Sequence, residues 1–247
     1  MRIPVNVLTK LYVEENKSPT IIGKELGCGE TTVRKLLKNY GIPMRTLSEA
    51  NRLIRLRSIP ILDDFREIID GLLLGDGNLH SPVGFQAVYH QDSSMSEFIE
   101  YVSRIFSSNN YLAQTYTYTR FDKRTSKIYT SFSLNSLYTI ELQILYNAWY
   151  NGGRKVIPTD ISITPSLMTV WYLSDGSKDS RCKNATIATE SFTTQEVELL
   201  CSLVNNEIGI NCYRQSNNRI RIPSRSFDKF INYLGECPVG CYSYKYV

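Results

Sequence analysis

Two related stretches decide the fold of this chain: DGLLLGDGNL at Asp70–Leu79 and TVWYLSDGSK at Thr169–Lys178. They lie 99 positions apart, and each is an apolar helical stretch that ends in an Asp-Gly pair. An acidic side chain at a helix C-terminus faces the negative end of the helix dipole, which costs roughly 0.3–1 kcal/mol unless a cation lies nearby. A single Asp-Gly pair is more often a buried helix that stops at a glycine. Because the pattern occurs twice, we predict that Asp76 and Asp175 are halves of one metal site.

Small residues within both stretches predict that the two helices pack against each other. Gly71 and Gly75 fall on one helix face, and Val170 and Ser174 occupy the same positions in the second copy. Small side chains allow two helix backbones to approach closely. Close packing would bring the carboxylates at the two helix ends together.

The repeat continues beyond these stretches. Fifteen residues after each aspartate stand Gln91 and Glu190, each at the end of a strand-like run and before an amphipathic helix, which predicts an unbroken register. Next come an alternating pattern typical of a hairpin and another helix, and each half closes with a lysine. We therefore predict an α+β fold with two pseudo-symmetric αββαββα repeats, 63–160 and 161–247, around a two-helix interface.

These residues resemble the LAGLIDADG homing endonucleases, in particular the monomeric kind that carries two motif copies in one chain. The resemblance covers about residues 63–247. It implies that Asp76 and Asp175 are the metal-binding acids. It also implies that a lysine near the end of each repeat, Lys155 or Lys245, lies beside the active site.

The two copies are not identical. Val170 replaces the first small residue of the family motif, so we expect less tight helix packing there. The earlier acid of the motif is Leu74 in the first copy and Leu173 in the second, while the metal carboxylates are retained. His80 and His90 are candidate general bases, but neither has a counterpart in the second copy, and we assign them structural or surface roles.

The resemblance implies an endonuclease that hydrolyses phosphodiester bonds on both strands of a long DNA site. Its paired carboxylates would hold divalent cations that polarise the phosphate and lower the pKa of an attacking water. The backbone carbonyls of Gly75 and Ser174 are natural additional ligands, because helix C-terminal carbonyls lack partners inside the helix. Oxygen ligands predict magnesium, with two or three Mg2+ ions between the repeats. The two lysines would stabilise charge on the phosphate, and Gln91 and Glu190 would position solvent.

Basic and aromatic side chains on the predicted hairpins form a candidate DNA platform. Alternate residues of a strand share a face, so one face of the first hairpin carries Tyr116, Tyr118 and Arg120. The remaining candidates are Lys123, Arg124 and Lys127 near the tip of that hairpin and Arg214, Arg219 and Arg221 in the second repeat. Each alone could belong to an ordinary solvated surface, but as a set they favour binding to double-stranded DNA.

The N-terminal segment is the basic part of the chain, because residues 1–59 carry eleven Lys or Arg against five acids. A helix at Thr20–Leu26, a glycine turn and a second helix at Thr31–Asn39 predict a helix-turn-helix DNA-binding domain over residues 1–58. From Thr46, a T-x-x-E capping box predicts a further basic helix. The candidate DNA contacts are Thr32, Arg34, Lys35, Lys38, Arg45, Arg52 and Arg55.

Composition sets further expectations. With 247 residues, 42% hydrophobic content and a net charge of +4, the chain can bury a sizeable core in two or three compact units. Its six cysteines form no CxxC pair, which argues against structural zinc and favours reduced thiols. In the absence of an apolar run of about 18–20 residues or a signal-peptide core, we expect an intracellular protein that does not enter a membrane. The resemblance implies a monomer.

Two other functions remain open. A LAGLIDADG core can serve as a maturase in intron splicing, and a fused helix-turn-helix is typical of transcription regulators that keep the fold without the metal-binding acids. The presence of both motif aspartates and both lysines argues against pure regulation. Maturase activity stays open, because the same basic surface could bind intron RNA.

Overall fold

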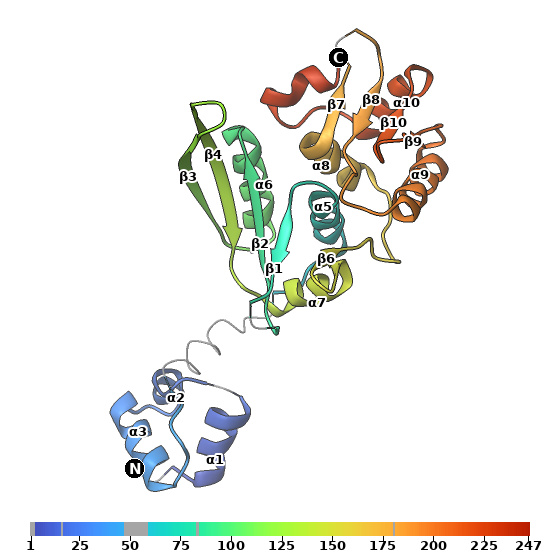
Figure 1. The fold of residues 1–247 in the computed structure, drawn as a ribbon. Helices are drawn as coiled ribbons and strands as arrows, with labels where there is room; N and C mark the ends of the chain where they lie inside the picture. Colours follow the sequence, from blue (N-terminus) through green and yellow to red (C-terminus); the bar gives the residue numbers. More distant parts are fainter. Residues whose placement is uncertain (1–2, 16, 47–58, 83, 180) are drawn as a thin grey trace. The chain divides into compact units, whose positions relative to one another are not determined.

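The computed structural model describes residues 3–15, 17–46, 59–82, 84–179 and 181–247. The chain divides into two compact units, Met1–Arg57 and Ser58–Val247 (Figure 1). Within the described residues, no helix combines the length and the apolar character that crossing a lipid bilayer requires.

The N-terminal unit is a small group of helices: α1 (Val5–Thr9), η1 (Lys10–Glu14), α2 (Pro19–Glu25) and α3 (Glu30–Asn39). Helix α3 is amphipathic and turns Val33 and Leu37 inward. These side chains join a separate apolar core, whose other fully enclosed members are Ile3, Leu8, Tyr12 and Ile22. The unit therefore has its own core.

The segment from α2 to α3 follows the pattern of helix, glycine turn and helix that the sequence predicts. Ser18 caps α2 by accepting a hydrogen bond from the Ile21 N–H, and Gly27 turns the chain at a φ of +66°. Arg52, Arg55 and the basic helix expected after Thr46 lie outside the described residues.

The second unit consists of two repeats with one order of elements, as predicted. The first runs α5 (Asp63–Leu74), β1 (Asn78–His80), β2 (Val88–Ser93), α6 (Ser96–Ser108), β3 (Ala113–Asp122), β4 (Lys127–Ser136) and α7 (Ile140–Trp149). The second runs α8 (Pro165–Asp175), β7 (Gly176–Lys178), β8 (Ala185–Ile187), α9 (Thr194–Ile208), β9 (Tyr213–Arg214), β10 (Ile220–Ile222) and α10 (Ser224–Leu234). After α7 come the short strands β5 (Tyr150–Asn151) and β6 (Arg154–Lys155), and after α10 comes the helix η2 (Gly240–Lys245).

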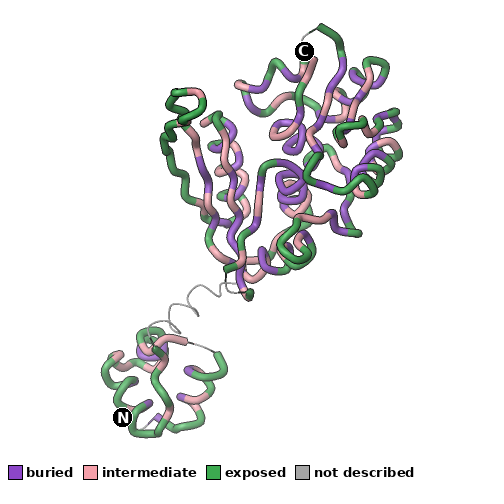
Figure 2. The backbone as a smooth tube through the Cα atoms, viewed as in Figure 1, coloured by how far each residue is buried: buried purple, intermediate pink, exposed green. Residues whose placement is uncertain are grey.

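Each repeat forms an antiparallel four-stranded sheet, with the order β1-β2-β4-β3 in the first and β7-β8-β10-β9 in the second. The strands correspond one to one, so the two sheets share one topology. Their lengths differ, because β3 and β4 have ten residues each whereas β9 and β10 have two and three. The outer part of the long hairpin is exposed (Figure 2).

Helices α5 and α8 lie side by side between the two sheets (Figure 1). A Cβ added to Gly71 would lie 2.3 Å from the Leu167 carbonyl oxygen and 2.6 Å from a methyl group of Val170. Only glycine permits so close an approach. The loosening expected at Val170 does not occur, because this larger side chain packs against a position that has none.

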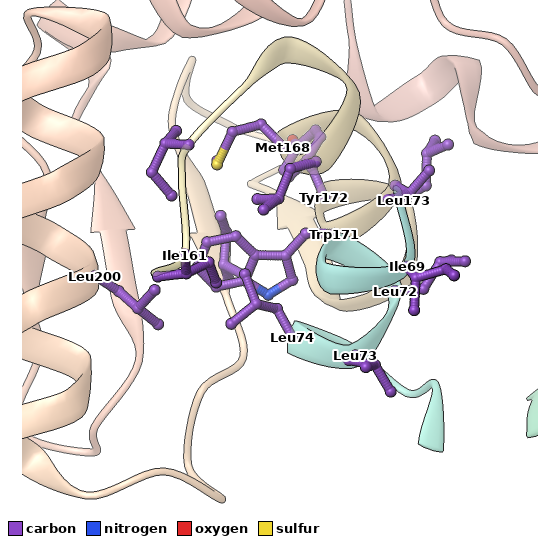
Figure 3. Close-up of a cluster of buried hydrophobic side chains, with 14 of the residues drawn as sticks. Ile69, Leu72, Leu73, Leu74, Ile161, Met168, Trp171, Tyr172, Leu173 and Leu200 are labelled. Atoms are coloured by element: carbon purple, nitrogen blue, oxygen red, sulfur yellow. The ribbon is translucent and has the colours of Figure 1, made fainter. Parts of the chain in front are cut away.

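Large apolar side chains surround the contact between these helices (Figure 3). Leu74 of α5 and Trp171 of α8 lie near Ile161, and Leu200 of α9 packs into the same buried cluster. This core holds the C-terminal ends of α5 and α8, the two motif helices, in place.

The hairpin after each motif has a different length in the two repeats. Strands β1 and β2 pair Asn78 with His90, whereas β7 and β8 pair Ser177 with Thr186. Since Asn78 and Ser177 occupy the same position after the motif aspartate, the connection in the second repeat is three residues shorter. The unbroken register predicted from the spacing is wrong.

The shift changes which residues correspond across the repeats. Gln91 is paired with Leu134 of β4. Ile220 of β10 is the counterpart of Leu134 in the second repeat, and it is paired with Ile187. Ile187, not Glu190, is therefore the structural counterpart of Gln91. Register follows strand pairing and turn length, which a count along the sequence does not detect.

Candidate active site

The two motif helices meet at their C-terminal ends. The Asp76 N–H donates to the Ser174 hydroxyl at 3.1 Å, and this hydroxyl donates to Asp175 Oδ1 at 3.2 Å. A Cβ on Gly75 would lie 2.7 Å from Ser174 Oγ and 3.4 Å from Asp175 Oδ1. The small residues predicted to pack the helices thus bring the two aspartates to one place.

Burial and like charge act together on the two carboxyl groups. Burial, followed by the negative charge of Asp76, raises the pKa of Asp175 to about 7. Burial also raises the pKa of Asp76, while the charges of Lys155 and Lys245 oppose the rise. A cation between the two carboxylates would relieve this repulsion.

Lys155 holds the end of the first motif helix. Its ammonium donates to the carbonyl oxygens of Leu73 at 2.8 Å, Gly75 at 3.1 Å and Gly77 at 2.8 Å. These three bonds use all three of its N–H donors. Burial lowers the pKa of Lys155 to about 8, against the charges of the two aspartates.

Lys245 has the same task at the second motif helix. Its ammonium donates to the carbonyl oxygens of Tyr172 at 3.3 Å and Leu173 at 2.6 Å, and it lies 4.3 Å from the centre of the Tyr242 ring. Burial lowers its pKa to about 8, opposed first by the charge of Asp175. Both lysines therefore lie at the ends of the motif helices and bind backbone carbonyl oxygens there, although the Tyr172 carbonyl oxygen also accepts the Gly176 N–H.

The carboxylate oxygens of Asp76 and Asp175 fit a hard divalent cation whose remaining ligands would come from water and substrate. Among the described residues no three His, Cys, Asp or Glu side chains gather closely enough to hold a metal ion. Mg²⁺ is usually held by one or two carboxylates, with water and substrate phosphate completing its octahedron. The pair Asp76 and Asp175 meets this requirement. The Gly75 carbonyl already accepts a hydrogen bond from Lys155, so only its second lone pair is available for a metal.

A polar cavity of about 280 Å³ opens beside Asp76. It lies on the face of the first sheet that points away from α6, and its lining includes Asp92 and His90. The sequence reasoning missed Asp92, which directly follows Gln91. The remaining lining residues are Asn78, Ser93, Ser94 and Ser131.

Comparison with known proteins gives the family. The model of the LAGLIDADG DNA endonuclease family matches residues 66–230. The chain belongs to this family. An uncharacterized protein of Methanocaldococcus jannaschii is 30% identical over 192 residues, which cover 76% of this chain and 73% of the relative.

Two further relatives differ in the activity that their names state. The cytochrome b mRNA maturase bI2 of Debaryomyces hansenii is 24% identical over 157 residues, which cover 59% of this chain and 57% of the relative. The solved structure of the homing endonuclease I-WcaI bound to its DNA recognition sequence has a TM-score of 0.72 at 19% identity, covering 83% of this chain and 96% of its own. This likeness shows that the chain has the fold of a LAGLIDADG homing endonuclease.

Gln91 and Glu190 lie in different surroundings in this LAGLIDADG chain. Gln91 is fully buried, accepts a hydrogen bond from the Tyr89 hydroxyl at 2.6 Å and donates to the Asp92 carbonyl oxygen at 3.1 Å. Glu190 is exposed and forms an ion pair with Arg219. The register difference separates these two residues, and both ends of the Gln91 amide are already engaged.

The predicted DNA platform of the first repeat lies on one face. Tyr116 and Tyr118 are paired with Ser133 and Ser131, so all four side chains share the face that carries Asp92. Arg120 is exposed on the same face. At the hairpin tip, Lys123, Arg124 and Lys127 are all exposed, as the sequence predicts.

In the second repeat, one predicted DNA contact lies on the opposite face of the sheet from the other two. Arg214 is paired with the buried Ile220, so it lies on the face covered by α9, where it donates to Glu198 at 3.2 Å. Arg219 and Arg221 alternate with buried isoleucines and lie on the opposite face. Tyr213, which is paired with Arg221 and exposed, is the residue that sequence reasoning missed on that face.

The N-terminal unit exposes most of its predicted DNA contacts. Thr32, Arg34, Lys35 and Lys38 are all exposed on α3, although Arg34 donates to Glu30 at 2.7 Å. Arg45 instead contributes to the unit itself, because its guanidinium lies 4.0 Å from the centre of the Tyr12 ring and donates to the Lys17 carbonyl oxygen at 3.2 Å.

Proposed function

We propose that this protein is a site-specific endonuclease that hydrolyses both strands of double-stranded DNA with a divalent metal, magnesium in the cell. The observation that carries this proposal is the meeting of Asp76 and Asp175 at the ends of the packed motif helices, where burial and like charge raise the pKa of Asp175 to about 7. Such a close pair of acids, with Asp175 partly buried and Asp76 exposed beside the cavity, is suited to a cation that is shared with phosphate.

The residues around the aspartates have distinct roles in this proposal. A bound divalent cation would polarise the phosphate and lower the pKa of the attacking water. Asp76 and Asp175 hold the cation, and the two lysines fix the helix ends and place two positive charges near the carboxylates. Gln91 supports the chain around Gly77, since a Cβ there would lie 3.0 Å from its Oε1.

The test is cleavage of a randomised duplex library followed by measurement on one selected duplex. Asp76→Asn and Asp175→Asn each keep the shape and remove a metal ligand, so cleavage should fall by about 10³-fold or more while binding survives. Asp228→Asn is a matched control, because Asp228 is an exposed carboxylate that pairs with Lys183 on the surface. Near wild-type cleavage by either motif variant would overturn the assignment.

A maturase is the second candidate, because one relative is named as an mRNA maturase. The exposed aromatic and basic face of β3 and β4 could bind RNA as well as DNA. Splicing of the precursor RNA that contains the coding sequence, with and without protein, separates the two activities. Splicing that survives in Asp76→Asn while DNA cleavage is lost would establish a second function.

We further propose that the N-terminal unit binds DNA through α3. Replacing Arg34, Lys35 and Lys38 with neutral residues should weaken binding to DNA. It should also reduce the slope of the logarithm of the binding constant against the logarithm of the salt concentration, by about one unit for each phosphate that is no longer neutralised. Removal of residues 1–58 should shorten the footprint on one side only, because the chain carries one copy of this unit. An unchanged footprint and salt slope would contradict the role.

The assembly and location are proposals of the same kind. One chain supplies both aspartates of the site, so we propose that a monomer is active. All six cysteines are free, which agrees with a reducing, intracellular location.

A further inference from the structure

The short segment that carries each lysine is bound by the other repeat. Lys155 lies in β6, which closes the first repeat, and its chain neighbours contact Glu196 in the first turn of α9 in the second repeat. Lys245 ends η2, which closes the second repeat, and the Cys241 N–H of η2 donates to Glu97 in the first turn of α6 in the first repeat. The contacts between lysine segments and glutamates are therefore exchanged between the repeats.

Glu196 joins the start of α9 to the chain on both sides of Lys155. Its Oε1 accepts the Ile157 N–H at 3.2 Å, and its Oε2 lies 3.0 Å from Arg154 Nη1. Oε2 also accepts the N–H and the hydroxyl of Thr193, which caps α9. Partial burial raises the pKa of Glu196, but Arg154 and Thr193 outweigh it and lower the pKa to about 2. The carboxylate is therefore ionised at neutral pH, and hydrogen bonds to an ionised acceptor are strong.

Glu97 makes a smaller contact of the same kind. Its Oε2 accepts the Cys241 N–H at 3.0 Å. The next residue of α6, Phe98, packs its ring against Tyr242 of η2, with 5.6 Å between the two ring centres. The Tyr242 ring is the one that lies against the Lys245 ammonium. The start of α6 therefore holds the part of η2 that places Lys245.

The two lysine segments are too short to keep a fixed position by themselves. Strands β5 and β6 have two residues each, and η2 is a six-residue 3-10 helix. An isolated two-stranded hairpin is marginally stable in water, and 3-10 hydrogen bonds have poorer geometry than those of an α-helix. Burial lowers the pKa of both lysines to about 8, so each ammonium loses hydration that well-placed carbonyl oxygens must replace. Contacts from outside each segment keep the ammonium on those carbonyls.

We propose that Glu196 and Glu97 are positioning residues, each of which places the lysine that the other repeat contributes to the site. Each lysine then fixes backbone carbonyl oxygens at the end of its own motif helix, and so the aspartate beside them. The part of this inference that concerns cleavage rests on the proposed nuclease function. Other residues line the cavity beside Asp76, so the glutamates act through the lysines and not on substrate.

Chemical labelling of the lysines tests the exchange without a cleavage assay. The full chain is treated briefly with acetic anhydride, and mass spectrometry follows the modification of each lysine. Glu196→Ala should raise the labelling rate of Lys155 by about tenfold, as expected when a hydrogen bond to a charged group is lost, and leave that of Lys245 unchanged. Glu97→Ala should do the reverse. Glu97→Gln keeps an oxygen for the Cys241 N–H, so it should restore the protection of Lys245.

Thr193→Ala is the matched control for Glu196→Ala. It also removes one half of the capping box of α9, but it leaves the bond from the Ile157 N–H to Glu196 in place. Both lysines should keep their wild-type labelling rates in this variant. Equal increases at Lys155 and Lys245 in Glu196→Ala, or the same increase in Thr193→Ala, would show general loosening and overturn the inference.

A double-mutant cycle tests the positioning role in cleavage, with magnesium and a duplex selected for cutting. Glu196→Ala should lower the single-turnover rate by about 10- to 100-fold, as misplacement of a reacting group does, with little change in affinity for DNA. Combined with Lys155→Met it should slow cleavage no further, whereas combined with Lys245→Met the two factors should multiply.

The outcomes of the cycle separate the inference from the function beneath it. The same result with both lysines, whether multiplication or none, would overturn the pairing of Glu196 with Lys155. If wild-type protein cuts no member of a duplex library, the proposed nuclease function fails, and the labelling pattern alone decides whether the repeats exchange these contacts.

Discussion

Repeat 1 and repeat 2 present the same backbone to the site but different side chains across it. In repeat 1 the motif aspartate faces Asp92, whereas in repeat 2 it faces Ala188, beside a strand that carries the half-buried Arg221. The helix pair keeps both aspartates and both lysine contacts. The comparison teaches that the helix interface carries the symmetric part of the site, while the sheet beside it is free to diverge.

The largest expected effect concerns the helix interface, where Gly71 faces the second copy. Gly71→Ala would place a methyl group 2.3 Å from the Leu167 carbonyl oxygen, so the helices must separate. We expect a loss of about 3 kcal/mol or more in the free energy of unfolding, measured by urea denaturation. Such a loss would show that the fold depends on the close contact of α5 and α8, the part of the site that both repeats share.

The partner position supplies the control for this prediction. Val170→Ala removes a methyl group that lies 2.6 Å from the added carbon, and should itself cost only about 1–2 kcal/mol. Combined with Gly71→Ala, it should restore part of the stability, because the Leu167 carbonyl still clashes. A neutral Gly71→Ala would contradict the close approach of α5 and α8.

The two lysines test how strongly each repeat holds the end of its motif helix. Lys155→Met should cost about 2–3 kcal/mol because three carbonyls lose a donor, and Lys245→Met about 1–2 kcal/mol because two do and the new side chain still packs on Tyr242. Thermal unfolding measures both. Lys183→Met, at an exposed surface pair, should be nearly neutral.

Single-turnover cleavage by the same variants separates two roles of the lysines. If their main role is to hold the helix ends, stability falls as described. Variants with unchanged melting temperatures and slow cleavage would instead assign both lysines to the stabilisation of charge on the phosphate.

The smallest expected effect is the pH dependence of stability without divalent metal. The folded pKa of Asp175, about 7, exceeds its unfolded value near 3.8, so the folded state binds the extra proton between these values. The contribution of this group to the free energy of unfolding therefore falls as pH rises through about 4 to 7. Asp175→Asn should be more stable than wild type above pH 7, by about 1–2 kcal/mol or roughly 3–6 °C.

The matched variant at the other aspartate completes this test. Burial also raises the pKa of Asp76, and we expect Asp76→Asn to give a smaller gain above pH 7. Melting curves in EDTA from pH 4 to 9 measure both differences. A constant difference between Asp175→Asn and wild type across this range would contradict the shifted pKa.

The sequence predicted the elements that have a local sequence pattern. It did not predict strand register or the face on which a strand residue lies, because these depend on strand pairing. The Asp-Gly repeat predicted that the two aspartates lie together, and the position of Gly71 and Gly75 on one helix face predicted the helix pair. The three-residue difference between the hairpins lies in polar connections that carry no apolar pattern, so counting residues joined Gln91 to Glu190. A short strand such as β9 has too few alternations to fix its inward face, which is why Arg214 was assigned to DNA.

Asp92 was missed for a related reason. It directly follows Gln91, and neighbouring residues of a strand point to opposite faces, so choosing one excludes the other. Only the pairing of β2 with β1 and β4 shows which side faces the cavity.

The unequal hairpins have a consequence for the information content of a DNA target. Ten residues of extended strand span about 33 Å, the length of about ten base pairs, whereas the three residues of β10 span about 10 Å, or three base pairs. Most of the sequence that the protein can discriminate would then belong to one half-site. A palindromic DNA site is therefore a poor match to this protein. Substitution of residues on β3 and β4 is the most direct way to change the DNA sequence that it recognises.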